Sequence, residues 1–271
     1  MYIVKVPGIN GLGKTKGCEK AGNAILKSLK EEFFANEKGK AIEFGKLSLE
    51  EIHLDNSNLE LTNKLIYENS FETFEEHAKT IFLGGDHSVS YSLTRAFFDY
   101  CENKGKEPCL IVFDAHPDVM EPVDRNFPTH EEWLRGLIED GFPVKNILIV
   151  GVRNSDPQET SYLKKKGIRM ISINSLNENL EETTDVITEF AKDKDLYVSL
   201  DIDVVDPAFA PSTGYPEPGG LTSRQLIYVV QRISKMKNLR AVDIVEINET
   251  KDNENNNLTL KLGAKIVSEL I

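Results

Sequence analysis

Carboxylate and imidazole side chains recur in three short segments of this chain, and each segment follows an apolar run. The segments are GGDHS (84–88), DAHPD (114–118) and DID (201–203). A hard or borderline divalent cation binds carboxylate oxygen and imidazole nitrogen, so these residue types fit a metal site. Alternate residues of an extended segment share one side, which lets the side chains of each segment converge. The candidate metal ligands are His87, Asp114, His116, Asp118, Asp201 and Asp203.

This ligand set is large enough for two ions, because four of its six members are carboxylates and carboxylates can bridge. Two such ions activate a water molecule as a nucleophile at neutral pH, which makes an enzyme the leading hypothesis. Each segment taken alone also fits a turn or a helix cap. Three of them at the ends of predicted strands favour the metal site, since independent loops would otherwise have to bring the same residue types to one edge.

The elements that must position these residues alternate between strand-like and helix-like patterns. The predicted strands are Tyr2–Val6, Ala41–Phe44, Thr80–Leu83, Cys109–Phe113, Asn146–Val150, Arg169–Ile173, Leu196–Leu200 and Arg240–Val245. Amphipathic stretches lie near 19–35, 59–79, 89–104, 130–140, 157–166, 178–192, 222–236 and 258–270. This alternation predicts an α/β fold with a mostly parallel sheet of about eight strands and helices on both faces. Ligands bind beyond the carboxyl ends of such strands, which is where all three segments lie.

Composition limits the partners of this chain. Its 271 residues carry a formal net charge of -12, so it is a poor candidate for binding nucleic-acid phosphates or anionic lipid. The charge mildly favours a cationic substrate, although solubility explains it equally well. Three cysteines without a metal-type spacing and the lack of any apolar run of about 18 residues predict a cytoplasmic protein without a disulfide scaffold or a membrane span.

The motif set resembles that of the ureohydrolase superfamily, which comprises arginases, agmatinases and related guanidino or formimino hydrolases. GGDHS, DAHPD and SLDIDVVDP (199–207) carry the resemblance, and further similar segments follow in the same order. These are THEE (129–132), VGVRNSDP (150–157), PEPGGLT (216–222) and DIVEIN (243–248). The resemblance covers about residues 80 to 250 and is highly specific.

The resemblance implies a fold and a metal centre. The fold would be a three-layer α/β/α arrangement, with residues 1–271 forming a single arginase-like domain that assembles as a trimer or hexamer. One manganese ion would be held by His87, Asp114, Asp118 and Asp201. The other would be held by Asp114, His116, Asp201 and Asp203, so that Asp114 and Asp201 bridge. Cobalt, nickel or zinc fits the same ligand types.

The resemblance also implies roles in catalysis. Glu246 would receive the guanidinium group of a small cationic substrate through charge-assisted hydrogen bonds. His130 would pass a proton or contact the leaving amine, and Asp118 is a second candidate for protonating the departing nitrogen. Urea and an amine would be the products.

The substrate side chain is harder to predict. Asp156 matches a position that reads the α-amino group of arginine, whereas Met120 and Asn126 stand near places where arginases carry asparagine and serine. The PEPGG segment (216–220) is more similar to the corresponding segment of agmatinases. Arginine is the preferred substrate of this interpretation, and agmatine is a close alternative. Guanidinobutyrase and formimidoylglutamase activities stay open.

Two interpretations from other classes compete with this one. Residues Gly8–Thr15 satisfy the G-x-x-x-x-G-K-[ST] pattern of a phosphate-binding loop and follow a predicted strand, which suggests a nucleotide hydrolase. Gly17 would then fall in the first turn of the following helix and weaken it. A metal-binding protein without catalysis is the third interpretation, and only an activity screen separates it from the first.

Overall fold

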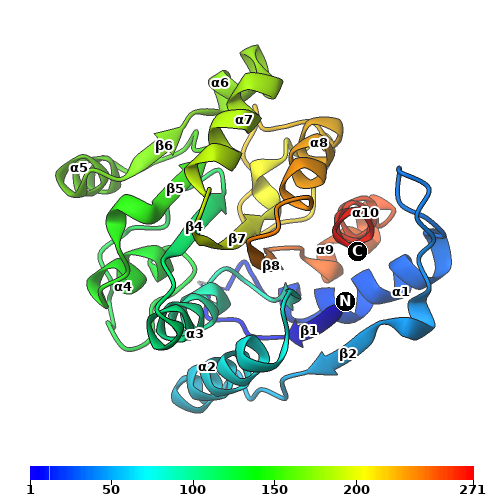
Figure 1. Cartoon of the computed structure of the whole chain (residues 1–271), viewed down its shortest axis with the longest axis horizontal. Coiled ribbons are helices and arrows are strands. Elements are labelled where there is room, and N and C mark those ends of the chain that lie inside the picture. The colour runs from blue at the N-terminus through cyan, green and yellow to red at the C-terminus, as the bar shows by residue number, and fades with distance from the viewer. Residues whose placement is uncertain (12) are drawn as a thin grey trace.

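Eight strands form one sheet in which every pairing is parallel, as predicted. The structure, a computed structural model, describes residues 1–11 and 13–271. Its strands are β1 (Tyr2–Val6), β2 (Ser48–Glu51), β3 (Thr80–Gly84), β4 (Pro108–Phe113), β5 (Ile147–Val150), β6 (Arg169–Ile171), β7 (Asp195–Asp201) and β8 (Leu239–Val245). They lie in the order β2-β1-β3-β8-β7-β4-β5-β6 (Figure 1).

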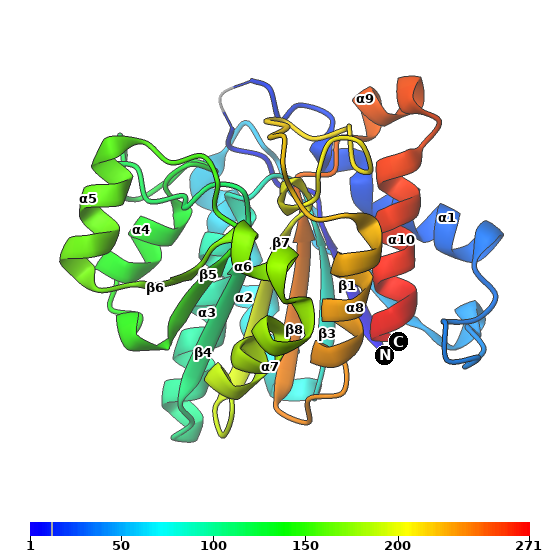
Figure 2. The same ribbon diagram turned by 90° about the horizontal axis from the view of Figure 1, so that it is seen from above.

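Helices cover both faces of this sheet (Figure 2). They are α1 (Ala21–Glu32), α2 (Leu59–Glu76), α3 (Val89–Lys104), α4 (Trp133–Glu139), α5 (Pro157–Lys166), α6 (Ile173–Glu178), α7 (Leu180–Phe190), α8 (Ser223–Ile233), α9 (Glu249–Asp252) and α10 (Leu258–Leu270). One apolar core joins the sheet to α1, α7, α8 and α10, and a second joins it to α2, α3 and α4. These three layers agree with the predicted architecture. Within the described residues, no helix combines the length and apolar character that crossing a membrane requires.

The central strands are buried on both faces, because crossover helices cover each side of a parallel sheet. Every residue of β3 and β4 is buried, and all of β7 except its first residue. Their sequences are correspondingly apolar at most positions, although Ser199 interrupts the run in β7. This explains why the sequence located these strands within one residue of their observed bounds at most ends.

The prediction of a strand at 41–44 was wrong. The second strand is β2, and it pairs with β1 through Ser48–Glu51 at the edge of the sheet. Ala41 instead makes an isolated antiparallel bridge to Ala35, and Phe44–Lys46 forms a 3-10 turn. An edge strand is exposed and held by backbone pairing, so its sequence carries little apolar signal. Side chains add to this pairing, since Lys5 of β1 forms an ion pair with Glu51.

The predicted strand Arg169–Ile173 also ends earlier than expected, at Ile171. Ser172 caps the following short helix α6, and its hydroxyl oxygen accepts a hydrogen bond from the backbone N–H of Ser175 at 3.2 Å. Serine at this position favours a helix start over strand continuation. Helices α6 and α9 were not predicted, because neither is long enough to show a period of 3.6 residues.

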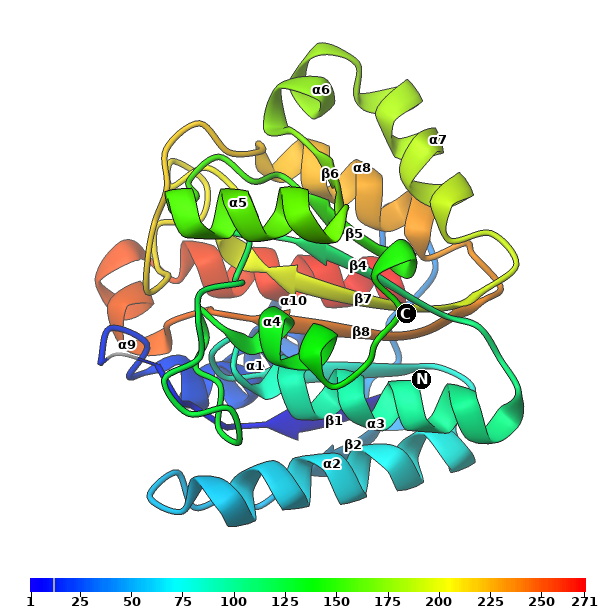
Figure 3. The ribbon, with the colours of Figure 1, turned by 90° about the vertical axis from the view of Figure 1, so that its left-hand side faces the viewer.

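Four consecutive places in the sheet carry the candidate site. In the order β3-β8-β7-β4, strands that are distant in sequence become neighbours, so that their carboxyl ends meet at one edge. The loops that follow them gather at the top of Figure 2 and on the left of Figure 3. The loop after β1 (dark blue) and the loop after β7 (yellow to gold) lie at the same edge.

An aromatic cluster holds α2 and α3 against the sheet. The ring centroid of Phe74 lies 5.8 Å from that of Phe82, 5.6 Å from that of Phe97 and 5.9 Å from that of Tyr100. Phe74 is 1% exposed, so its whole ring is removed from water. Aromatic pairs at these separations stabilise a core beyond the area they bury.

We expect Phe74→Ala to lower the free energy of unfolding by about 3–5 kcal/mol, because it removes a ring and leaves a cavity. Phe34→Ala is the matched control, since the Phe34 side chain is 77% exposed. Its effect should stay within about 0.5 kcal/mol. Urea denaturation followed by circular dichroism measures both. Similar midpoints for the two variants would show that the cluster does not anchor α2.

Candidate metal centre

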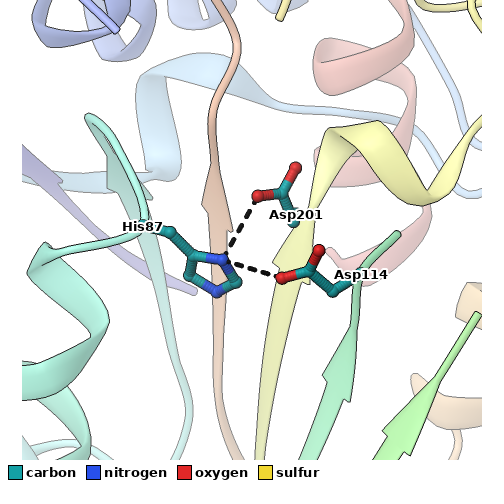
Figure 4. A group of neighbouring side chains, drawn as sticks. All are labelled: His87, Asp114 and Asp201. Carbon is teal, nitrogen blue, oxygen red and sulfur yellow. Dashed lines mark ion pairs between the residues drawn. The ribbon is translucent and has the colours of Figure 1, made fainter. Parts of the chain in front are cut away.

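His87 lies against three aspartates at the end of the central strands. Its Nδ1 atom is 3.0 Å from Oδ2 of Asp114, 3.0 Å from Oδ2 of Asp118 and 3.2 Å from Oδ2 of Asp201. Figure 4 shows His87, Asp114 and Asp201 pointing toward one another from three different elements. All four side chains are buried. The loops after β3 and β4 and the last residue of β7 supply them.

The contacts of this group are not ordinary hydrogen bonds. Among the described residues, neither Nδ1 of His87 nor Oδ2 of Asp114 has a hydrogen-bond partner of acceptable geometry, although both atoms are buried. Buried polar atoms are nearly always paired, so two unpaired atoms that face each other call for an explanation. Ligands directed at a shared cation have this arrangement, because their lone pairs point at the ion rather than at one another.

A second group lies beside the first. Nδ1 of His116 is 2.9 Å from Oδ2 of Asp203 and 3.6 Å from Oδ1 of Asp114. Asp114 therefore presents Oδ2 to His87 and Oδ1 to His116, as a bridging carboxylate does. The two sets that can hold an ion are His87 with Asp114 and Asp201, and Asp114 with His116 and Asp203.

Five of the six predicted ligands belong to these two sets, and Asp201 lies in only one of them. Asp118 lies beside His87 but belongs to neither set, so its role as a ligand stays a prediction from the family resemblance. The Oδ2 atom of Asp201 faces His87, and its Oδ1 atom accepts a hydrogen bond from the backbone N–H of Asp203 at 2.7 Å. Bridging by Asp201 stays a prediction from the family resemblance. The geometry that carries the bridge in this structure is that of Asp114.

Charge repulsion and burial shape the acidity of this cluster. Burial, together with Asp203 and Asp114, raises the pKa of Asp201 well above its usual value. Burial and then Asp114 raise the pKa of Asp118 to about 7. For His87, burial opposes protonation, but the three aspartates outweigh it and the pKa is raised. The cluster therefore attracts positive charge, either as protons or as a divalent cation.

Trp133 orients two of the ligands, a contact that sequence reasoning did not predict. Its Nε1–H donates to Oδ2 of Asp118 at 2.9 Å, and its ring centroid lies 4.7 Å from that of His87. Asp118 has a φ of 52°, which non-glycine residues rarely adopt. Such backbone conformations persist only where surrounding contacts enforce them, and they cluster at functional sites.

Glu246, the predicted guanidinium partner, directly follows β8 in the chain. It is buried and has a φ of 64°. Its Oε1 atom accepts a hydrogen bond from the backbone N–H of His87 at 3.0 Å. The thiol of Cys18 lies 3.9 Å from Oε2 and contributes a weak hydrogen bond. Burial, and after it the charge of Asp86, raises the pKa of Glu246 well above its usual value. A cation placed beside this carboxylate would remove that penalty.

His130 lines the same pocket as Glu246, and one of its ring nitrogens has no hydrogen-bond partner among the described residues. The side chain is 4% exposed, its ring lies 5.1 Å from that of Tyr215, and its Nε2 atom has no hydrogen-bond partner among the described residues. Burial lowers its pKa, which keeps the imidazole neutral at neutral pH. A neutral imidazole can accept or donate a proton at the unpaired nitrogen.

The pocket that joins these residues has a volume of about 270 Å³. Its inner wall consists of candidate ligands, Glu246 and His130, and its outer wall includes Met120, Glu131, Asp156, Tyr215 and Glu217. Predicted Asp156 is exposed at the N-terminus of α5, where its Oδ1 atom accepts from the backbone N–H of Gln158 at 2.8 Å. Glu217 was not predicted, and it lies 3.6 Å from Nε2 of His116. No lysine or arginine belongs to the described lining.

The segment that resembles a phosphate-binding loop encloses a carboxylate of the protein itself. Oδ2 of Asp86 accepts hydrogen bonds from the backbone N–H of Asn10 at 2.9 Å and from the hydroxyl of Thr15 at 2.9 Å. Leu12 lies outside the described residues. The next α-helix begins at Ala21 after a 3-10 turn, not at Thr15. These donors are occupied by Asp86, which disfavours the nucleotide-binding interpretation.

We expect Asp114→Asn to reduce bound Mn²⁺ from about two ions per chain to less than one, because an amide cannot bridge two cations as a carboxylate does. Metal analysis after dialysis against a chelating resin measures this. Asp193→Asn is the control, since Asp193 is exposed and its φ of 63° suits asparagine. Full metal content in Asp114→Asn would exclude the bridging arrangement.

The stabilisation by Mn²⁺ should grow with pH. Without a bound cation, the pKa values of His87 and His116 are raised by aspartates and those of Asp201 and Asp203 by burial, so protons occupy the cluster at pH 6. Metal binding must displace them, which becomes easier as pH rises. We expect a fixed Mn²⁺ concentration to raise Tm more at pH 8 than at pH 6. Scanning fluorimetry measures Tm, and an equal or larger gain at pH 6 would contradict the assignment.

Comparison with known proteins places the chain in a family. The model of the arginase family matches residues 1–271. Arginase 1 of Oryza sativa subsp. indica is 30% identical over 197 residues, which cover 72% of this chain and 55% of that protein. The chain thus matches about half the length of this plant relative. N(1)-aminopropylagmatine ureohydrolase of Thermus thermophilus is 29% identical over 249 residues, with 91% of this chain and 82% of that protein covered.

Comparison of the fold with solved structures supports the same family. The crystal structure of proclavaminate amidino hydrolase from Streptomyces clavuligerus superposes with a TM-score of 0.86 at 25% identity and covers 99% of this chain and 89% of that one. Together with the match over residues 1–271, this likeness shows that the chain belongs to the arginase family.

Proposed function

We propose that this protein is a ureohydrolase that holds two divalent cations and hydrolyses a guanidino substrate to urea and an amine. The observation that carries the proposal is Asp114, which presents one oxygen to each of two imidazole-containing ligand sets beside a pocket that the other candidate ligands line. Glu246 and His130 line the same pocket. Membership of the arginase family supports the same reaction class.

The ligands fit the cations that the family resemblance implies. His87, Asp114, Asp118 and Asp201 would hold one ion, and Asp114, His116, Asp201 and Asp203 the other. Mn²⁺ is the first candidate, and cobalt, nickel and zinc share the ligand preferences. When bound, two such ions would lower the pKa of a water molecule, which makes it a nucleophile at neutral pH. The unpaired Nδ1 atom of His87 and Oδ2 atom of Asp114 support this fit.

The protein side chains then orient the substrate and move its protons. Glu246 pairs with the planar guanidinium, and this pairing relieves the cost of a buried carboxylate. Water adds its oxygen to the guanidinium carbon, the bond from that carbon to the alkyl nitrogen breaks, and the departing nitrogen takes up a proton. His130 would deliver this proton, and its unpaired Nε2 atom supports that role. Asp118, which accepts from Trp133, is the second candidate for this step.

The outer pocket favours a substrate whose tail is cationic. Glu131, Asp156 and Glu217 line it, whereas no lysine or arginine does so among the described residues. An amine in the tail would be attracted there, whereas an α-carboxylate would face like charges. Met120 offers no hydrogen bond where arginases carry a polar side chain. These features support agmatine or an aminopropyl derivative of it.

Arginine is the second candidate, and two observations favour it. The plant arginase is 30% identical to the chain. Asp156 is exposed at the pocket with one carboxylate oxygen engaged in capping α5, so its other oxygen can receive an α-amino group. The proposal extends to the remaining family features, namely one domain over residues 1–271, a homotrimer or hexamer, and a cytoplasmic location.

Urea release by the Mn²⁺-loaded protein tests the function. We expect turnover of agmatine to exceed that of arginine, 4-guanidinobutyrate and 3-guanidinopropionate, and to stop on addition of EDTA. Preference for arginine would overturn the proposed substrate tail but keep the reaction. No urea from any guanidino compound would overturn the reaction and direct the search to formimino substrates.

Glu246→Gln should keep its bound Mn²⁺ but lower kcat/KM by about 10²-fold or more, because the charged partner of the guanidinium is lost. Glu254→Gln is the control, since Glu254 is exposed on the last turn before α10. Metal analysis and urea release on the same samples separate the two effects. Unchanged kinetics in Glu246→Gln would remove Glu246 from substrate binding.

A further inference from the structure

The second ring nitrogen of His87 is held by a buried serine. Nε2 of His87 lies 2.9 Å from Oγ of Ser199, which belongs to β7 two residues before Asp201. His87 is 1% exposed and Ser199 is fully buried. No water can therefore compete for this contact, and the partner of Nε2 is set by the protein alone.

Ser199 is in turn held by a buried carboxylate on the next strand. Ser199 and Asp243 are paired neighbours in the register of β7 and β8. The hydroxyl of Ser199 donates to Oδ1 of Asp243 at 2.8 Å. The hydroxyls of Tyr197 and Ser90 donate to Oδ2 of Asp243 at 2.8 and 2.9 Å. Asp243 is fully buried and accepts from three hydroxyl groups.

This set of partners fixes the direction of the hydrogen bonds. A carboxylate can only accept, so the single hydroxyl proton of Ser199 points to Asp243. Ser199 then offers His87 a lone pair, which requires a proton on Nε2. The lone pair of His87 in its neutral form consequently lies on Nδ1, the atom that faces Asp114, Asp118 and Asp201. Contact of Ser199 with Ser90 is longer, at 3.3 Å.

Sheet packing does not account for Asp243. Its neighbours along β8 are apolar, and a central strand covered on both faces is normally apolar throughout. A buried carboxylate weakens the fold unless its hydrogen bonds compensate for lost hydration. Metal-bound histidines, by contrast, almost always donate their second ring N–H to a carboxylate, a backbone carbonyl or water. In this protein the hydroxyl of Ser199 stands between His87 and such a carboxylate.

We propose that Ser199 and Asp243 are positioning residues that fix the tautomer and ring orientation of His87 and thereby set the affinity of the first ligand set for its cation. This inference rests on the proposed function only in that a divalent cation binds at His87. Neither residue touches the substrate pocket, so their effect on catalysis runs through the metal.

Isothermal titration with Mn²⁺, without substrate, tests the proposal. We expect Ser199→Ala to weaken one of the two binding steps by about 10- to 100-fold and to leave the other unchanged. Asp243→Asn keeps the side-chain volume and should weaken the same step. Ser70→Ala is the matched control, because Ser70 is a fully buried serine on α2 whose hydroxyl has no hydrogen-bond partner among the described residues.

Spectroscopy gives a second readout that packing alone does not change. The nitrogen chemical shifts of His87 in the protein loaded with diamagnetic Zn²⁺ should report a proton on Nε2 in the native chain and in Ser70→Ala. In Ser199→Ala this N–H signal should shift and exchange faster with water. Ser199→Ala with native affinity at both steps, or Ser70→Ala with the same loss, would overturn the proposal.

The outcome is separable from that of the proposed function. If the native chain binds two ions and releases no urea, while Ser199→Ala loses one binding step, the positioning role stands and the ureohydrolase assignment falls. If urea is released and Ser199→Ala binds both ions as the native chain does, the positioning role falls alone.

Discussion

Mutual repulsion among buried aspartates is the constraint on which the site depends. Four aspartates are buried at the carboxyl ends of the central strands with almost no access to water, namely Asp114, Asp118, Asp201 and Asp203. Carboxylates in such a place are costly unless positive charge is near. Two imidazoles supply part of this positive charge, and the aspartates accordingly raise the pKa values of His87 and His116. Divalent cations would supply more positive charge than two imidazoles do. The same repulsion that destabilises the fold therefore favours binding of such cations.

Hydrogen bonds from the rest of the protein oppose this repulsion, because they hold the carboxylates in fixed orientations. Trp133 fixes Asp118 through its indole N–H. The backbone N–H of Asp203 fixes Asp201, and the backbone N–H of Ala115 donates to Asp203 at 2.9 Å. Like charges held this way cannot move apart, which keeps the ligand geometry set before any ion arrives.

Residues within one motif were predictable, whereas residues joined only by the fold were not. The spacing in DAHPD and DID pointed to five of the six candidate ligands, because alternate residues of one segment share a side, and GGDHS added His87. Ser199 and Asp243 meet only through the register of β7 and β8, and Trp133 of α4 reaches Asp118 in the loop after β4. The edge strand β2 escaped prediction for a related reason, since backbone pairing rather than an apolar pattern defines it.

The position of β8 has a consequence for how this protein assembles. It is the last strand of the described chain, yet it lies between β3 and β7. The strands β2-β1-β3 and β7-β4-β5-β6 have no direct pairing with each other, so the sheet stays in two parts until β8 enters. His87 belongs to one part and the aspartates to the other. We therefore expect the sheet edge that holds the ligands to be complete only after β8 has been synthesised and has entered between β3 and β7, so that folding of β8 precedes capture of a cation.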